Sequence, residues 1–162
     1  MSKAKSIPLF LLRLLALGAT VCATIVMVTS HESTKVLNMT FEAKYSDSPT
    51  FKYFLVVNAV ASGYSLIILF LSSKNLTWQL VLVSDLVITS LLISSLSAAL
   101  GVSQVAKKGN LHAGWLPICG QVPKFCDHVA GALVSELIAA IFYFLLLLNS
   151  LHNTLDLLTL QA

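Results

Sequence analysis

The chain has 162 residues, of which 57% are hydrophobic and only 10% are charged. A soluble domain carries about 25% charged residues, so this composition excludes a water-soluble protein whose surface is covered with polar groups. The net charge of +3 is distributed over the chain without a basic run, and we therefore expect no nucleic-acid partner.

Four long apolar segments follow one another along the chain. Each is long enough to cross the ~30 Å hydrocarbon core of a bilayer as a helix of about 20 residues. None shows the alternation that marks a barrel strand, and in lipid a helix satisfies its own backbone hydrogen bonds. The sequence therefore predicts an all-α integral membrane protein, an antiparallel four-transmembrane-helix bundle with both termini on one side. The predicted helices cover about residues 7–30, 53–71, 80–100 and 129–148.

The segments between these helices are too short to bury a soluble core of their own. We therefore expect residues 1–162 to form a single membrane domain, with outer loops at 31–52 and 101–128 and an inner loop at 72–79. The lipid bilayer is the first partner that the sequence predicts.

The orientation in the membrane rests on signals that disagree. With cytoplasmic termini, three lysines lie on the inner side and six lie in the outer loops, which is opposite to the usual cytoplasmic excess. The first helix often dominates, however, and Lys3 and Lys5 precede it together with the free amine. This local asymmetry favours cytoplasmic termini, as do the cysteines and the glycosylation sequons.

Two of the three cysteines share the second outer loop. Cys119 and Cys126 are seven residues apart, and a disulfide between them would persist only on an oxidising face. Free thiols are an alternative, and so is a metal site with His112 and His128, although the spacing matches no zinc pattern. We favour the disulfide. Cys22 lies within the first helix and is expected to be a small packing residue.

Two N-glycosylation sequons are present, at Asn38 and at Asn75. Asn75 lies in a loop so short that it is held against the bilayer. Asn38 has more room and is the predicted acceptor, provided that the first outer loop faces the lumen. The sequons therefore favour the same orientation as the cysteines.

Three ionisable residues lie within the predicted helices, where a charge costs about 2.5–3.5 kcal/mol on insertion scales. Arg13 and Asp85 each lie ~8–9 Å into a helix at 1.5 Å per residue, and these two helices cross in the same direction. Because both side chains are then at the same depth, we predict an intramembrane ion pair between them. The alternative is that Arg13 extends to the headgroups and Asp85 stays unpaired near the interface.

Glu136 is the third ionisable residue, and Asn58 in the second helix lies at a comparable depth. We expect a second polar level, formed either by a hydrogen bond between these side chains or by a neutral Glu136. Arg13, Asp85 and Glu136 also allow a different class of function, a small transporter or proton-coupled channel. Transporters usually add further acids and broken helices near the midplane, so we expect the charges to be structural.

The sequence contains no nucleophile–base pair, phosphate-binding loop or metalloprotease motif. We therefore predict no enzymatic activity, no cofactor and no metal. Small residues spaced four apart would let helices approach closely, within one bundle or between protomers. They are Ala59 and Gly63, then Ser90, Ser94 and Ala98, and finally Gly131 and Ser135.

Residues along the whole chain form a recognisable pattern. In the second outer loop they are Lys108-Gly109-Asn110, His112-Ala113-Gly114-Trp115 and the segment from Cys119 to Cys126, with Gly131 and Ala132 beyond it; in the helices they are Arg13 and Ser84-Asp85-Leu86. With this pattern the chain resembles the plant Casparian strip membrane domain protein-like (CASP-like) family. The resemblance covers all four predicted helices.

The resemblance implies a multi-pass plasma-membrane protein with cytoplasmic termini, related in topology to MARVEL-type four-helix proteins. It implies homo- and hetero-oligomers with related four-helix membrane proteins. Founding members form immobile platforms that exclude other membrane proteins and direct lignin deposition, so extracellular cell-wall enzymes are further candidate partners. The first outer loop, His31 to Lys52, lacks the aromatic- and proline-containing signature of the founding members. The implied function is therefore a general scaffold that organises membrane subdomains.

Overall fold

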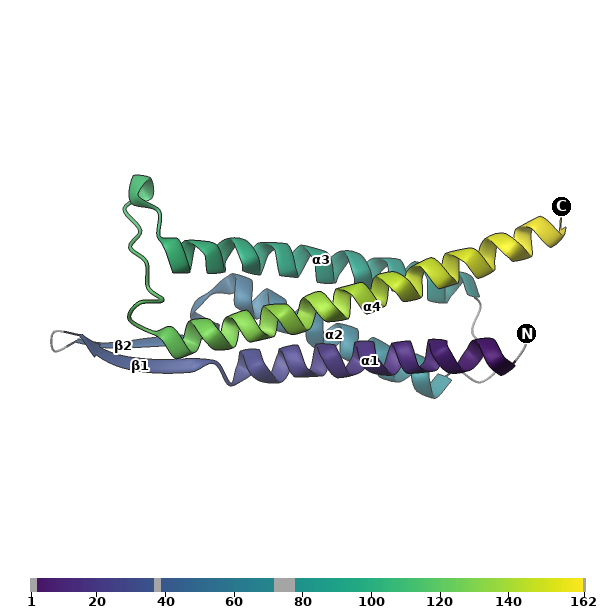
Figure 1. The fold of residues 1–162 in the computed structure, drawn as a ribbon, viewed down its shortest axis with the longest axis horizontal. Helices are drawn as coiled ribbons and strands as arrows, with labels where there is room; N and C mark the ends of the chain where they lie inside the picture. Colours follow the sequence, from purple (N-terminus) through teal and green to yellow (C-terminus); the bar gives the residue numbers. More distant parts are fainter. Residues whose placement is uncertain (1–2, 37–38, 72–77, 162) are drawn as a thin grey trace.

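The computed structural model describes residues 3–36, 39–71 and 78–161, and four long helices run side by side in it (Figure 1). Their bounds are Lys3–Val28 for α1, Pro49–Leu71 for α2, Trp78–Lys108 for α3 and Pro123–Gln161 for α4. Each helix is long and apolar enough to cross a membrane. The predicted all-α four-helix membrane bundle is therefore confirmed.

The start of α1 and the end of α4 lie at the same end of the bundle (Figure 1). We call this the terminal end, and the opposite end, where α3 leads into α4, the loop end. The most extensive helix contacts are those of α4 with α1 and α3, and α2 packs against the same two helices. The helices therefore form a ring in which α1 and α3 are diagonally opposite.

The helices extend beyond the predicted membrane-crossing segments. α3 continues to Lys108 instead of residue 100, and α4 covers 123–161 instead of 129–148. Hydropathy marks the part of a helix that lies in lipid, whereas the helix itself continues until it reaches a helix-terminating residue. Gly109 follows α3 with a φ of 69°, which favours glycine at a helix end. A Cβ there would lie 2.7 Å from the carbonyl oxygen of Trp115, so a larger residue does not fit.

The predicted loop at 31–52 contains a two-stranded hairpin that the sequence does not predict. β1 (His31–Val36) pairs antiparallel with β2 (Met39–Lys44), and a 3-10 turn at Tyr45–Asp47 leads on into α2. The alternation of polar and apolar residues is confined to β2, because β1 is polar at every position but its last. Figure 1 shows the hairpin projecting from the loop end.

The buried side chains form two apolar clusters along the bundle. The loop-end cluster comprises Ala23, Met27, Phe51, Phe54, Leu96, Ala99, Val122, Phe125, Val129, Ala132 and Leu133. The cluster nearer the terminal end comprises Ala16, Val57, Ala61, Ile88, Leu92, Ala140, Tyr143 and Leu146. Large apolar side chains on the outside of all four helices are exposed on the protein, as expected of a surface that contacts lipid.

Candidate functional site

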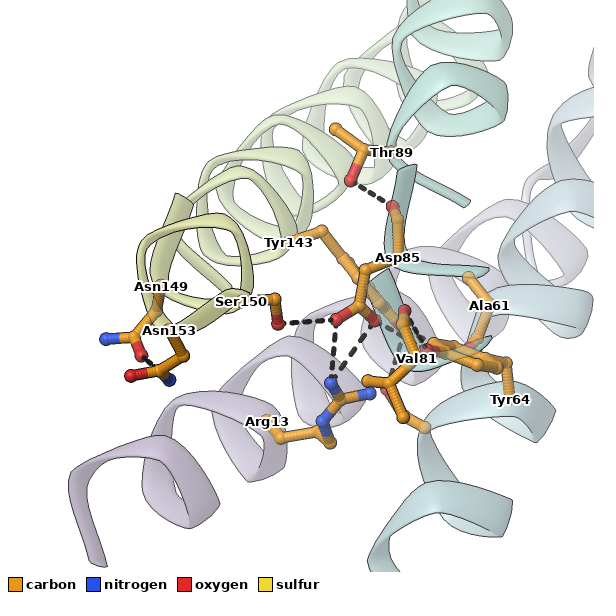
Figure 2. Close-up of polar contacts among 11 residues, drawn as sticks. Arg13, Ala61, Tyr64, Val81, Asp85, Thr89, Tyr143, Asn149, Ser150 and Asn153 are labelled. Carbon is orange, nitrogen blue, oxygen red and sulfur yellow. Dashed lines mark hydrogen bonds and ion pairs between the residues drawn. The ribbon is translucent and has the colours of Figure 1, made fainter. Parts of the chain in front are cut away.

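Arg13 and Asp85 lie side by side toward the terminal end of the bundle (Figure 2). Nη2 of Arg13 lies 3.2 Å from Oδ1 and 3.0 Å from Oδ2 of Asp85. The Asp85 side chain is fully buried, and that of Arg13 is 9% exposed. The structure thus brings together, from the diagonally opposite helices α1 and α3, the two side chains whose equal depth the sequence indicates.

Two further side chains complete this group, which we call the terminal polar cluster: Arg13, Tyr64, Asp85 and Ser150. The hydroxyl of Tyr64 donates to Oδ1 of Asp85 at 2.6 Å, and the Tyr64 ring centroid lies 5.5 Å from the guanidinium carbon of Arg13. Ser150 Oγ donates to Oδ2 of Asp85 at 3.5 Å. α1, α2 and α4 therefore each place one residue around the carboxylate that α3 contributes.

A second bond between α2 and α4 lies next to this cluster. The hydroxyl of Tyr143 donates to the carbonyl oxygen of Ala61 at 2.7 Å, and it lies 2.6 Å from Oγ of Ser65. Both Tyr143 and Ser65 are fully buried. A buried tyrosine hydroxyl thus has its hydrogen-bonding need met by the diagonally opposite helix, and buried tyrosines usually find such a partner.

Glu136, Asn58 and Ser95 form the middle polar cluster, between the two apolar clusters. Oε1 of Glu136 accepts from Nδ2 of Asn58 at 3.0 Å and from Oγ of Ser95 at 2.6 Å. All three side chains are fully buried. Oε2 of Glu136 and Oδ1 of Asn58 have no hydrogen-bond partner among the residues that the structure describes, and the same holds for Nη1 of Arg13. The cluster joins α2, α3 and α4 without a cation.

At the loop end, Cys119 and Cys126 are joined in a disulfide, with their Cα atoms 5.7 Å apart. Nearby, Oε2 of Glu32 accepts from the backbone N–H of Phe125 at 3.0 Å. A carboxylate is favourable at a helix N-terminus because the first N–H groups lack helical partners. This bond ties the hairpin to the start of α4.

The remaining predicted sites are placed as follows. Asn38, the predicted glycosylation site, lies outside the described residues, and so does Asn75. His112 and His128 are both exposed. Within 3–36, 39–71 and 78–161, no group of three histidine, cysteine, aspartate or glutamate side chains lies close enough to hold a metal ion.

Tyr64, Ser150 and Ser95 belong to the two polar clusters, and the sequence does not single them out. Serine hydroxyls cost little in a membrane helix because they can bond to their own backbone, and tyrosine is uncharged, so neither residue type stands out in the sequence. Tyr64 and Asn58 are six apart on α2, which places each at the depth of its partner. Depth against Glu136 indicates Asn58, as predicted, and matching depth against Asp85 would have indicated Tyr64 as well.

The arrangement can hold four helices in one register. Asp85 accepts bonds from α1, α2 and α4, so a shift or rotation of any of these helices breaks a contact with a buried charge. Removing one partner of a buried ion pair costs about 3–5 kcal/mol, because the other charge is left uncompensated. The terminal polar cluster therefore links all four helices through one buried carboxylate.

Comparison with known proteins assigns the fold to a family. Residues 2–142 match the family model of the Casparian strip membrane protein domain. CASP-like protein 1C1 of Vitis vinifera is 56% identical over 156 residues, which cover 96% of this chain and 98% of the relative. CASP-like protein 1C2 of Ricinus communis and CASP-like protein 1C1 of Arabidopsis thaliana are 59% and 58% identical, each over 90% of this chain and 88% of the relative. No solved structure matches the chain. The resemblance that the sequence indicates is confirmed, and the chain belongs to the Casparian strip membrane protein domain family.

Proposed function

We propose that the chain is a non-enzymatic scaffold of the plasma membrane that oligomerises with itself and with related four-helix membrane proteins, and so organises membrane subdomains. Family membership supports this, and one structural observation carries it. The buried polar side chains bond to one another across the bundle, while large apolar side chains cover its outside. A bundle fixed in this way is suited to packing against neighbours in the bilayer.

In this proposal both termini are cytoplasmic. The disulfide supports the orientation, because it lies at the loop end, opposite the start of α1 and the end of α4, and disulfides persist in oxidising compartments. The hairpin would then be extracellular, and Asn38 would be a glycosylation acceptor. The hairpin and residues 109–122 would also be the parts that recruit extracellular cell-wall enzymes.

Photobleaching of a tagged copy in living cells tests the proposal. A scaffold that assembles into patches recovers far more slowly than a monomeric single-span protein carrying the same tag, and the slow fraction coincides with the patches. Recovery as fast as that of the single-span control, at expression levels matched to the untagged protein, would show that the chain organises no immobile membrane subdomain.

A further inference from the structure

Glu136 is a buried acidic residue in the middle of the bundle with no cation beside it. Its side chain is fully buried, and it takes part in none of the ion pairs found among the described residues. Arg13 is the only buried cation among these residues, and it pairs with Asp85. Burial disfavours the charged form of an acid, above all within a membrane. Glu136 therefore either carries an uncompensated charge in the bundle or is neutral.

The two carboxyl oxygens of Glu136 have unequal surroundings. Oε1 accepts from Nδ2 of Asn58 at 3.0 Å and from Oγ of Ser95 at 2.6 Å, whereas Oε2 has no hydrogen-bond partner among the described residues. An ionised carboxylate shares its charge between both oxygens and can only accept hydrogen bonds, whereas a carboxylic acid accepts through its carbonyl oxygen and donates through its hydroxyl. The unequal pattern is that of an acid whose carbonyl oxygen is Oε1.

The acceptor that such a hydroxyl needs is present on Asn58. Nδ2 of Asn58 already donates twice, to Oε1 of Glu136 and, at 2.9 Å, to the carbonyl oxygen of Phe54. Its Oδ1 is buried and has no donor within the part of the chain that the structure describes. The two unpartnered oxygens thus belong to two side chains that already share a hydrogen bond. One proton on Oε2 would satisfy both of them, because the O–H of Glu136 would donate to Asn58.

The other titratable groups inside the bundle are engaged elsewhere. The hydroxyl of Tyr143 donates to the carbonyl oxygen of Ala61, and Asp85 is paired with Arg13. The remaining acidic residues are exposed or half-buried at the surface: Glu32, Glu42, Asp47, Asp127 and Asp156. Among the described residues, Glu136 is therefore the one acid that is buried without a cation.

A water molecule between the two unpartnered oxygens is the alternative. Its two O–H groups could donate to Oε2 of Glu136 and to Oδ1 of Asn58, since buried waters commonly bridge such atoms. The water would leave a full negative charge inside the bundle, however, and charges within a membrane usually pair. A proton removes the charge and supplies the missing hydrogen bond together.

We propose that Glu136 is a carboxylic acid in the folded protein, with a proton bound on Oε2 and donated in a hydrogen bond to Oδ1 of Asn58. Two reciprocal hydrogen bonds then join α4 to α2, and the bond from Ser95 adds α3. The middle polar cluster is thus a binding site for one proton, deep in the bundle. This inference goes beyond the scaffold function proposed above and does not depend on it.

Infrared spectroscopy of the purified protein tests for the proton directly. The protein is kept at neutral pH in a detergent without carbonyl groups, so that the carbonyl stretching band of a protonated carboxyl group is not hidden by lipid esters. We expect this band in the wild type, its loss in Glu136→Gln, and its retention in Asp156→Asn, which removes an exposed acid of the same helix. Glu136→Gln should keep the fold, because its amide N–H can donate to Asn58 in place of the acid.

Removing one donor from Oε1 tests which oxygen carries the proton. In Ser95→Ala the carbonyl group of Glu136 loses one of its two hydrogen bonds, so the acid band should move to a higher wavenumber. The matched control is Ser90→Ala, at an exposed serine of the same helix that bonds only to the carbonyl oxygen of Leu86, and it should leave the band in place. The shift also assigns the band to Glu136 if Glu136→Gln does not fold.

Two results would overturn the proposal. A wild-type spectrum without an acid band at neutral pH would show that Glu136 is ionised, as it would be beside a bridging water. A band that persists in Glu136→Gln, or that does not move in Ser95→Ala, would belong to another group or to an acid with its proton on Oε1. Either result excludes the hydrogen bond from Oε2 to Asn58.

Discussion

The two polar clusters solve the same problem with different chemistry. Each buries a carboxyl group inside a membrane bundle and joins helices through it. In the terminal polar cluster, Asp85 is balanced by Arg13 and bonded from three other helices. In the middle polar cluster, Glu136 has two neutral donors on one oxygen and none on the other among the described residues. The first depends on charge balance, and the second depends on hydrogen bonds alone.

The largest effect is expected from breaking the charge balance. Arg13→Leu or Asp85→Leu leaves one buried charge without its counterpart, and we expect each to lower the free energy of unfolding by about 3–5 kcal/mol. In cells, both variants should be retained inside rather than delivered to the surface. Unfolding of purified protein in mixed micelles, followed by the loss of helical circular dichroism, measures the change.

Two double variants decide whether the residues act as a pair. Exchanging them, as Arg13→Asp with Asp85→Arg, should recover part of the loss, and Arg13→Leu with Asp85→Leu should recover more because no charge remains. Additive losses in both double variants would show that the two side chains are independent.

A smaller effect is expected from removing one neutral donor of the same cluster. Tyr64→Phe keeps the ring beside Arg13 but deletes the 2.6 Å hydrogen bond to Asp85. We expect a loss of about 1–2 kcal/mol, since a hydrogen bond to a charged group exceeds the ~0.6 kcal/mol average between membrane helices. Tyr53→Phe is the control, because it removes only a 3.4 Å hydrogen bond from an exposed hydroxyl of the same helix to the neutral side chain of Ser94. If the free energy of unfolding is unchanged in both variants, the hydrogen bond from Tyr64 to Asp85 does not stabilise the bundle.

The smallest effect is expected in the middle polar cluster. Glu136→Gln retains a carbonyl oxygen that can accept from both Asn58 and Ser95, so we expect a change within about 0.6 kcal/mol. Glu136→Leu leaves Asn58 and Ser95 only their backbone acceptors, the carbonyl oxygens of Phe54 and Leu92, and should cost about 0.5–1.5 kcal/mol for each hydrogen bond lost. Were Glu136→Gln as damaging as the loss of Arg13, the negative charge of Glu136 would be essential and the contrast between the clusters would be wrong. The same unfolding measurement makes the comparison.

The sequence predicts the part of this structure that depends on depth. Counting residues from the membrane boundary is enough to place Arg13 level with Asp85 and Glu136 level with Asn58. It does not give the rotation of each helix about its axis, which is why Ser95 could not be assigned as a partner. Ser150 lies beyond the predicted end of the fourth membrane segment at about residue 148, so its depth was not predicted either. The rotation follows from how side chains on four helices fit together, and no single segment carries that information.

The parts outside lipid were less predictable for another reason. Within the bilayer, the surrounding lipid requires long apolar helices, so the four helices are evident from hydropathy. Beyond it that rule ends, and the full lengths of α3 and α4 and the hairpin at 31–44 depend on local hydrogen bonding. The bond from Phe125 to Glu32 spans 93 positions of sequence and has no local signature.

The uninterrupted course of α4 makes it a lever. One arm begins at Pro123, where Glu32 couples the helix to the hairpin, and the other ends at Gln161. Glu136 divides the helix into arms of 13 and 25 residues, the differences between position 136 and the two ends of α4. If α4 tilts about this point as a stiff rod, its far end moves about twice as far as its near end, because length is proportional to residue number at 1.5 Å per residue. The bond of Ser150 to Asp85 lies on the longer arm, so a displacement of the hairpin would reach Gln161, enlarged and reversed in direction, only if that bond gave way.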